Sequence, residues 1–260
     1  MTLNNMMFFD INYLEYYSSY TGTSVLSATV GNVIDNRAVP TMDFSATVGA
    51  MYLTTTDYYT CSNFFICEHN LSNFSIVLNT GTTWYTSTTY TNNTLSTTYS
   101  ALSSTVDCYG MGVTFDGTQD NDVAYIGEMI MTKEKFTLNY NPSKYVPAMV
   151  DLSNFKRLYG GRSVYSTSGN YFTAKIAWDH LIGDVDPAVS TDLKFVSELA
   201  RRKTSFLFWP NANGSDVNMY TWLPQHVFKC KITTPETVYE FSSRNLTNII
   251  KVQYTIEEMQ

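Results

Sequence analysis

The side chains best suited to bind a metal ion are scarce in this chain, which has three histidines and four cysteines. Cys67 and His69 are two residues apart and would share one face of an extended strand, and Cys61 has the same parity. A tetrahedral zinc site built on them needs a fourth ligand, for which Cys108 is the only obvious candidate. Buried free thiols and a packed histidine are the simpler interpretation, so the sequence predicts no bound metal and no cofactor.

Carboxylates offer two further kinds of chemistry. Asp116, Asp120 and Asp122 lie in one turn, DGTQDND, and could hold Ca²⁺, but their spacing differs from that of known calcium loops, so a solvated turn is preferred. Glu128 with Asp107 or Asp116 could in principle hydrolyse a glycoside, which needs two carboxyl groups at a defined separation. The chain has no GxSxG, GxxxxGK[ST] or HExxH motif. We therefore predict no catalytic residue and no enzymatic activity.

Glu128 also stands out because it interrupts the mostly apolar run AYIGEMIM over residues 124–131. A run of this kind is typical of a central strand that is buried on both faces. A carboxylate inside such a strand needs hydrogen-bond partners. The sequence therefore predicts that Glu128 is a structural carboxylate at a domain interface.

Aromatic side chains are unusually frequent, with 20 Tyr and 15 Phe. Exposed rings can stack on sugars, and rings in Thr-rich sheets can equally pack across strands or form subunit contacts. The candidates for glycan or interface contacts are Tyr58, Tyr59, Trp84, Tyr85 and Tyr90. Packing or subunit contact is the more ordinary of the two interpretations.

The elements that would position these residues are mostly strands. From Val25 onward, short apolar segments alternate with polar turns about every ten residues, which indicates a sandwich or barrel. Later in the chain Ser190 or Thr191 could cap a helix that ends at the basic residues 201–203. The predicted fold class is mainly β: an N-terminal antiparallel β-sandwich (jelly roll), then a smaller α+β domain with one clear helix. The predicted division is an irregular segment 1–24, a sandwich 25–132 and an α+β domain 133–260.

Charge and hydropathy exclude several classes of partner. The formal net charge of -7 disfavours nucleic-acid binding, which needs concentrated Lys and Arg. The N-terminus carries Asp10 and Glu15 beside its apolar residues and has no positive region, unlike a signal peptide. No run approaches the ~18 apolar residues of a membrane span. We expect cytosolic synthesis, no direct nucleic-acid readout and no membrane insertion.

The first half resembles the galactose-binding-like (discoidin-type) jelly rolls. The resemblance is carried by ATVGNVIDNR, NFFICEHNLSNFSIVL and VAYIGEMIM. The matching motifs are residues 32–36, His69-Asn70-Leu71 and Ile126-Gly127-Glu128. It covers residues 25–130 and implies a jelly-roll fold there.

The second half resembles the C-terminal part of tail and baseplate proteins of tailed bacteriophages, on residues 198–210 and 249–258. This resemblance implies a non-enzymatic virion structural protein of the distal-tail type. Its partners would be copies of itself in a ring and other tail proteins, and it would be located in the virion tail after assembly in the host cytoplasm. The alternative is a carbohydrate-binding module for host-surface glycans, with binding loops near residues 32–36, Asn70 and Tyr90. A polysaccharide hydrolase is a third hypothesis, which the missing catalytic motifs disfavour.

Overall fold

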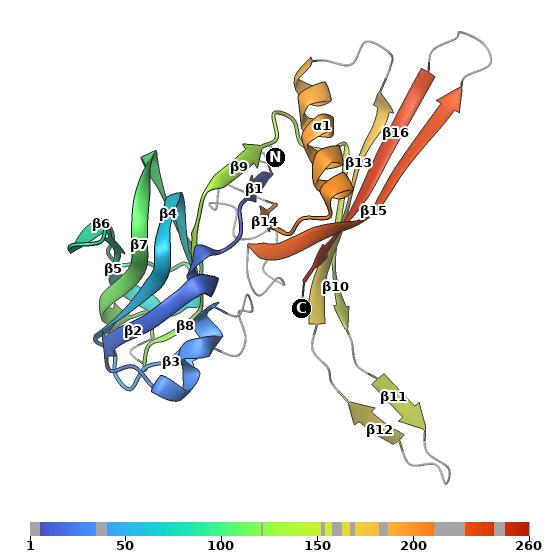
Figure 1. The fold of residues 1–260 in the computed structure, drawn as a ribbon. Helices are drawn as coiled ribbons and strands as arrows, with labels where there is room; N and C mark the ends of the chain where they lie inside the picture. The colour runs from blue at the N-terminus through green and yellow to red at the C-terminus, as the bar shows by residue number, and fades with distance from the viewer. Residues whose placement is uncertain are drawn as a thin grey trace. The chain divides into compact units, whose positions relative to one another are not determined.

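The structure is a computed structural model that describes residues 6–34, 41–120, 122–151, 154–157, 163–166, 170–181, 187–210, 227–241 and 248–259. By its contacts the chain forms two compact units. The sandwich unit consists of Met7–Phe136 and Trp209–Val227, and the helix unit of Met1–Met6, Thr137–Phe208 and Phe228–Gln260. The predicted fold class is confirmed: the chain is mainly β with antiparallel sheets and one clear helix, consistent with a jelly-roll sandwich and a smaller domain (Figure 1). The predicted domain boundaries stay predictions.

The sandwich unit is built almost entirely from strands. Its elements are β1 (Met7–Phe9), η1 (Tyr13–Tyr16), β2 (Tyr17–Thr23), η2 (Ser27–Ile34), β3 (Met42–Asp43), β4 (Gly49–His69), β5 (Leu71–Asn79), β6 (Trp84–Tyr90), β7 (Thr98–Thr118), β8 (Tyr125–Thr132) and β9 (Glu134–Thr137). The main sheet has the order β3-β8-β4-β7-β5-β6, and β2 pairs with β4. The start of the chain, predicted to be irregular, thus holds β1, η1 and β2 in its described part.

Two long strands, β4 and β7, contribute to both layers of the sandwich. Residues 49–54 of β4 pair with β2 and with residues 110–115 of β7, which also pairs with β5. Residues 61–66 of β4 pair instead with residues 98–106 of β7 and with β8. The register shifts between these two parts, between Thr54 and Tyr59. A bulge of this kind bends a strand, so it lets β4 pass from one layer to the other.

The core lies between the layers and follows strand alternation. On β5, Phe74, Ile76 and Leu78 are buried in the core, while Ser75 and Asn79 point away from it. Other strands contribute Met51, Leu53, Phe64, Ile66, Met111, Val113, Phe115, Met129 and Met131. This regular alternation fixes which side chains of β5, β6 and β7 reach the outer face.

One segment predicted as a strand is a helix. The residues after Val25 form the 3-10 helix η2, and its Val30 and Val33 are buried in the core. These two side chains are three residues apart, which places them on one face of a helix with three residues per turn. The strand prediction for this stretch is therefore wrong, because its buried apolar side chains follow the three-residue spacing of a 3-10 helix.

Strand β8 is buried on both faces, as its apolar run predicts: residues 126–132 are all buried. On the face turned away from the core, Phe65 of β4 pairs with Ile130 of β8. Phe65 is fully buried there, with its ring centroid 5.3 Å from that of Phe9 and 5.2 Å from that of Trp209. The outer face of this layer is therefore a second apolar core rather than a solvent-exposed surface.

Asn12 closes part of the free edge of β8. Its side-chain oxygen accepts hydrogen bonds from the backbone N–H groups of Met131 and Leu14, both at 3.1 Å. Its Nδ2 donates to the backbone oxygen of Met129 at 2.8 Å and to Oε1 of Glu128 at 3.1 Å. One amide side chain thus takes the hydrogen-bonding place of a neighbouring strand.

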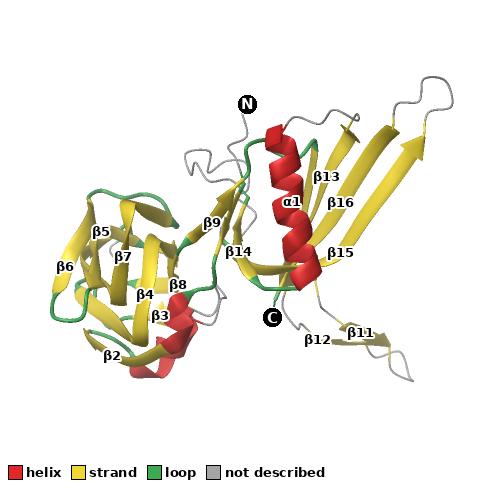
Figure 2. Cartoon of the chain, turned by 45° about the horizontal axis from the view of Figure 1, so that its top comes forward, coloured by secondary structure: helices red, strands yellow, loops and turns green. Residues whose placement is uncertain are grey.

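The helix unit has a sheet with one helix against it. Its elements are β10 (Lys144–Asp151), β11 (Asn154–Arg157), β12 (Ser163–Ser166), β13 (Asn170–Leu181), α1 (Pro187–Arg202), β14 (Phe206–Trp209), β15 (Phe228–Phe241) and β16 (Asn248–Glu258). The strand order is β10-β13-β16-β15-β14, and β11 and β12 form a separate hairpin. Figure 2 shows α1 lying over one face of this sheet. Among the described residues no helix is long and apolar enough to cross a membrane.

The start of α1 differs from its prediction. The helix begins at Pro187, a residue whose fixed φ suits the first helical position, so Thr191 lies inside the helix and its hydroxyl donates to the backbone oxygen of Pro187. Asp192 is fully buried and accepts hydrogen bonds from the backbone N–H groups of Asn139 and Tyr140 at 3.1 and 3.0 Å. Asp192 therefore anchors the loop that follows β9.

Candidate functional site

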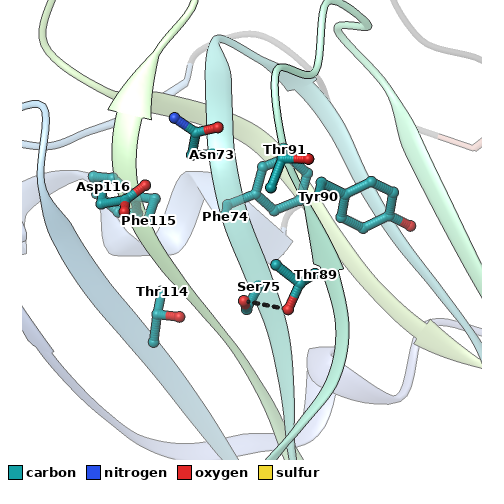
Figure 3. Close-up of a pocket in the computed structure, with 9 residues that line it drawn as sticks. All are labelled: Asn73, Phe74, Ser75, Thr89, Tyr90, Thr91, Thr114, Phe115 and Asp116. Atoms are coloured by element: carbon teal, nitrogen blue, oxygen red, sulfur yellow. Dashed lines mark hydrogen bonds between the residues drawn. The ribbon is translucent and has the colours of Figure 1, made fainter.

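A shallow pocket of about 290 Å³ lies on β5, β6 and β7 in the sandwich unit (Figure 3). Its lining residues are Asn73, Phe74, Ser75, Thr89, Tyr90, Thr91, Thr114, Phe115 and Asp116. Ligand pockets are usually 300 Å³ or larger, so this one has room for a single small group. Six of the nine lining residues are polar, and the other three are the aromatic residues Phe74, Phe115 and Tyr90, which belong to the core or pack against it.

Three hydroxyl groups form a row across the strands. Ser75 of β5 pairs with Thr89 of β6 on one side and with Thr114 of β7 on the other. Paired residues point to the same face of a sheet, and this face is opposite to that of the core residue Phe74. The hydroxyls of Ser75 and Thr89 are 2.9 Å apart, and Figure 3 shows this hydrogen bond. Strand register alone therefore places three groups that can each donate and accept.

The polar row continues toward Asn73 and Asp116 because β5 and β7 are irregular at this point. Phe74 pairs with Phe115, whereas Asn73 pairs with Gly117, which leaves Asp116 as an extra residue with an exposed side chain. Bulges re-aim side chains in this way. The side-chain oxygen of Asn73 accepts a hydrogen bond from the backbone N–H of Asn92 at 2.9 Å, which fixes its orientation. The pocket thus gains a fixed amide and a carboxylate.

Tyr90 is the predicted contact residue that the structure places at the pocket. Its ring stacks on Phe74 with centroids 4.7 Å apart and planes 18° apart. Its hydroxyl donates to the backbone oxygen of Tyr99 at 2.9 Å. Burial raises the pKa of Tyr90, so the phenol stays protonated. The ring is therefore held at both ends on the core side of the sheet, and the hydroxyl row lies on the opposite face.

The other four predicted aromatic contacts do not line the pocket. Tyr59 is half-buried and stacks on Tyr13 at 4.8 Å. Tyr58 is 57% exposed and lies against Tyr109, with centroids 5.0 Å apart. The two remaining residues lie on β6: Trp84 contacts Tyr52 at 4.8 Å, and Tyr85 is 38% exposed.

Most of the pocket residues had no signal of their own in the sequence. Asn73, Ser75, Thr89, Thr91 and Thr114 are common residues in a Thr- and Asn-rich chain. Only the alternation of β5 indicates that Ser75 faces away from the core. Asp116 was considered as a calcium ligand and as a hydrolase carboxylate, and the structure places it in this pocket instead.

The Asp-rich turn is held together by the HNL motif. Asn70 is buried, and its Nδ2 donates to Oδ1 of Asp120 at 3.2 Å and to the backbone oxygen of Val123 at 3.0 Å. Its Oδ1 accepts from the backbone N–H of Tyr125 at 2.9 Å. Of residues 32–36, the other predicted loop, only 32–34 are described, and Asn32 donates to the backbone oxygen of Thr41. Both motifs thus make contacts that hold loops in place.

The residues that the sequence offers as possible metal ligands, His69 and the cysteines, are buried side chains of the folded chain. His69 is buried, and its Nδ1 accepts a hydrogen bond from the backbone N–H of Leu71 at 3.1 Å. The cysteines are buried free thiols, and burial raises the pKa of Cys67 and Cys230. Among the residues that the structure describes, no group of three His, Cys, Asp or Glu side chains could hold a metal ion.

Glu128 lies on β8, which contributes no residue to the pocket. It is 1% exposed and accepts the hydrogen bond from Nδ2 of Asn12 described above. A buried carboxylate that receives an amide donor is a structural element of the sandwich unit. Its predicted role at a domain interface stays a prediction.

Acidification should destabilise the sandwich unit through His69. Burial lowers the pKa of His69 from 6.5 to about 3 in the folded protein. The unfolded chain therefore binds more protons between these values, so stability rises with pH across this window and is lost as pH falls from 6.5 toward 3. The expected slope is at most about 1.4 kcal/mol per pH unit. His69→Asn, which can still accept from Leu71, should remove this slope in urea denaturation measured at each pH.

The control for this experiment concerns the neighbouring residue. Burial raises the pKa of Glu68 from 4.5 to about 7, so its contribution to stability is present at low pH and is lost as pH rises through about 7. The two effects oppose each other in the wild type. The difference between the wild type and His69→Asn isolates the histidine, and a difference that stays constant from pH 3 to 6.5 would show the assignment to be wrong.

Comparisons with known proteins give no family for this chain: no protein-family model and no curated protein matches it. Among solved structures, it is similar to chitosan-binding module 1 of a chitosanase/glucanase from Paenibacillus sp. IK-5, with 13% identity, a TM-score of 0.41, and coverage of 47% of this chain and 98% of that one. It is also similar to the family 32 carbohydrate-binding module of NanJ from C. perfringens, in complex with galactose (13% identity, TM-score 0.41, coverage 49% and 99%). A third is the family 32 carbohydrate-binding module of EndoD from Streptococcus pneumoniae (10%, 0.39, 45% and 98%). At these TM-scores the likeness carries no inference about ligand or site.

Proposed function

We propose that the sandwich unit binds a neutral carbohydrate in the pocket of β5, β6 and β7. The observation that carries the proposal is the chemistry of the lining. Six of the nine lining residues carry polar side chains: Asn73, Ser75, Thr89, Thr91, Thr114 and Asp116. A sugar presents several hydroxyl groups that donate and accept, and hydroxyl, amide and carboxylate side chains satisfy both roles.

The charge of the pocket limits which class of ligand and which kind of activity it favours. Asp116 is the one carboxylate among the nine lining residues, and none of the nine is Lys, Arg or His. A carboxylate accepts hydrogen bonds from neighbouring hydroxyls and repels anions, so it favours a neutral ligand over an acidic one. Glycoside hydrolysis needs a second carboxyl group at a defined distance. Binding without catalysis is therefore the activity that we propose.

Asp116→Asn in the full chain should weaken carbohydrate binding about tenfold, because a hydrogen bond to a charged group contributes about 1.5–3 kcal/mol. The probes are galactose, glucose, N-acetylglucosamine and their oligomers of up to six units, with affinities from isothermal titration calorimetry. The matched control is Asp107→Asn, which removes the same charge from the same strand, where Asp107 accepts from Thr60. Equal affinities for both variants, or no binding of any probe to the wild type, would overturn the proposal.

The phage-tail resemblance leads to a separate proposal, ring assembly in a virion tail, which rests on the sequence alone. It is compatible with a glycan-binding sandwich, because a tail protein can carry an outward-facing binding module. Light scattering of the purified chain over a range of concentrations tests it. A strictly monomeric chain would count against ring assembly and would leave the carbohydrate proposal unaffected.

A further inference from the structure

Two aromatic rings meet on the outer face of the sheet that carries the pocket. Tyr52 lies on β4 and Trp84 on β6, and the strand order places β7 and β5 between them. The ring centroids are nevertheless 4.8 Å apart, with the planes inclined by 59°. Both rings must therefore lie across the two intervening strands rather than stand upright on their own.

Gly112 of β7 makes this arrangement possible. It pairs with Tyr52 on one side and with Val77 of β5 on the other. A Cβ atom at Gly112 would lie 2.6 Å from Cδ1 of Tyr52 and 3.0 Å from Cγ2 of Val77, so a side chain there would displace the tyrosine ring. Val77 faces away from the core yet is only 6% exposed, as expected beneath a cover of rings. The glycine thus leaves room for an aromatic pair on the outer face of the sheet.

This surface adjoins the pocket. Val77 follows the pocket residue Ser75 by two positions on β5, and Gly112 precedes Thr114 by two positions on β7, all on the same face. Two residues along a strand correspond to about 7 Å. The hydroxyl row and the aromatic pair are therefore consecutive along the strands, at the separation of adjoining groups in one extended ligand.

We infer that Tyr52 and Trp84 form a second subsite, so that the ligand is a neutral glycan chain of at least two sugar units rather than a single sugar. This inference rests on the proposed function of the pocket. One sugar hydrogen-bonds to the polar row, and the next lays the apolar C–H face of its ring on the half-buried rings of Tyr52 and Trp84. Both rings contact each other before a ligand arrives, so little conformational freedom is lost on binding.

The test measures affinity against chain length. The full chain is titrated calorimetrically with cello-, N-acetylchito- and galacto-oligosaccharides of one to six units. For the series that binds, wild-type affinity should rise at least fivefold from one unit to three. Trp84→Ala should abolish this rise and leave the affinity for the single sugar unchanged, whereas Asp116→Asn should lower the affinity for every length.

Controls separate a local effect from loss of structure. Trp84→Phe keeps a stacking ring and should retain part of the rise, even if Trp84→Ala proves poorly folded. Tyr58→Ala removes an exposed ring that lies against Tyr109 and not against Trp84, so this variant should keep the full rise in affinity with chain length. Equal affinity for all lengths, or a full rise in folded Trp84→Ala, overturns the second subsite alone. Absence of binding at every length overturns the pocket proposal itself.

Discussion

Replacing Asn12 by alanine should lower the free energy of unfolding of the sandwich unit by about 3–4 kcal/mol, because it leaves buried backbone groups without partners at about 1–3 kcal/mol each. Asn12 is fully buried. Its side-chain oxygen accepts hydrogen bonds from the N–H groups of Leu14 and Met131. Its Nδ2 donates to the carbonyl of Met129 and to the carboxylate of Glu128. Alanine is too short to reach any of them, and the surrounding packing keeps water away. The measurement is urea denaturation of the full chain followed by near-ultraviolet circular dichroism.

Asn12→Asp distinguishes the two halves of this network. An aspartate can still accept from Leu14 and Met131, but it cannot donate to Met129 and it places a second carboxylate beside Glu128. It should therefore destabilise the protein more at pH 7 than at pH 4, where protonation relieves the repulsion. Asn79→Ala serves as the control, since it removes a single exposed hydrogen bond to Gly81 and should cost less than 1 kcal/mol. A loss for Asn12→Ala no larger than that of Asn79→Ala would refute this role.

The sequence predicts well those elements whose burial is local. The run over residues 124–131 indicates a strand buried on both faces, and β8 is one. The prediction works because nearly every side chain in such a run is apolar, so both faces of the strand favour burial. The class of fold follows in the same way from the spacing of strands and turns. The helix is also found, although its start is misplaced: Thr191 suits a helix N-terminus, but Pro187 does so as well, and the helix begins at Pro187.

The candidate site is harder to predict because no local pattern defines it. Ser75, Thr89 and Thr114 come together only through the register of three strands, and register depends on the whole sheet. Asp116 lies beside these residues because of a bulge, and no pattern in the sequence indicates that bulge. Tyr90 could be named from its residue type, but so could four other rings that pack elsewhere. Trp84 is named with them, whereas its partner Tyr52 can reach it only because Gly112, its paired residue on the neighbouring strand β7, has no side chain.

Phe65→Ala should cost about 3–5 kcal/mol, the usual range for deleting a buried aromatic side chain. The ring is fully buried on the outer face of its layer, where it meets Phe9 edge-on at 5.3 Å, Tyr99 at 4.7 Å and Trp209 edge-on at 5.2 Å. Alanine would remove the centre of this aromatic cluster and leave a cavity that three rigid rings cannot fill. Denaturant titration of the full chain measures the loss.

Two variants make the result specific to the cluster. Phe65→Leu keeps most of the volume and should cost less than about 1.5 kcal/mol. Tyr58→Ala removes a ring of similar size that is 57% exposed, and should change stability by no more than about 0.5 kcal/mol. Should Phe65→Ala be tolerated as well as Tyr58→Ala, the covered face would be loosely packed. The N-terminal segment and Trp209 would then add little to the sandwich. A large loss instead means that these two segments, distant in sequence from β4, complete its fold.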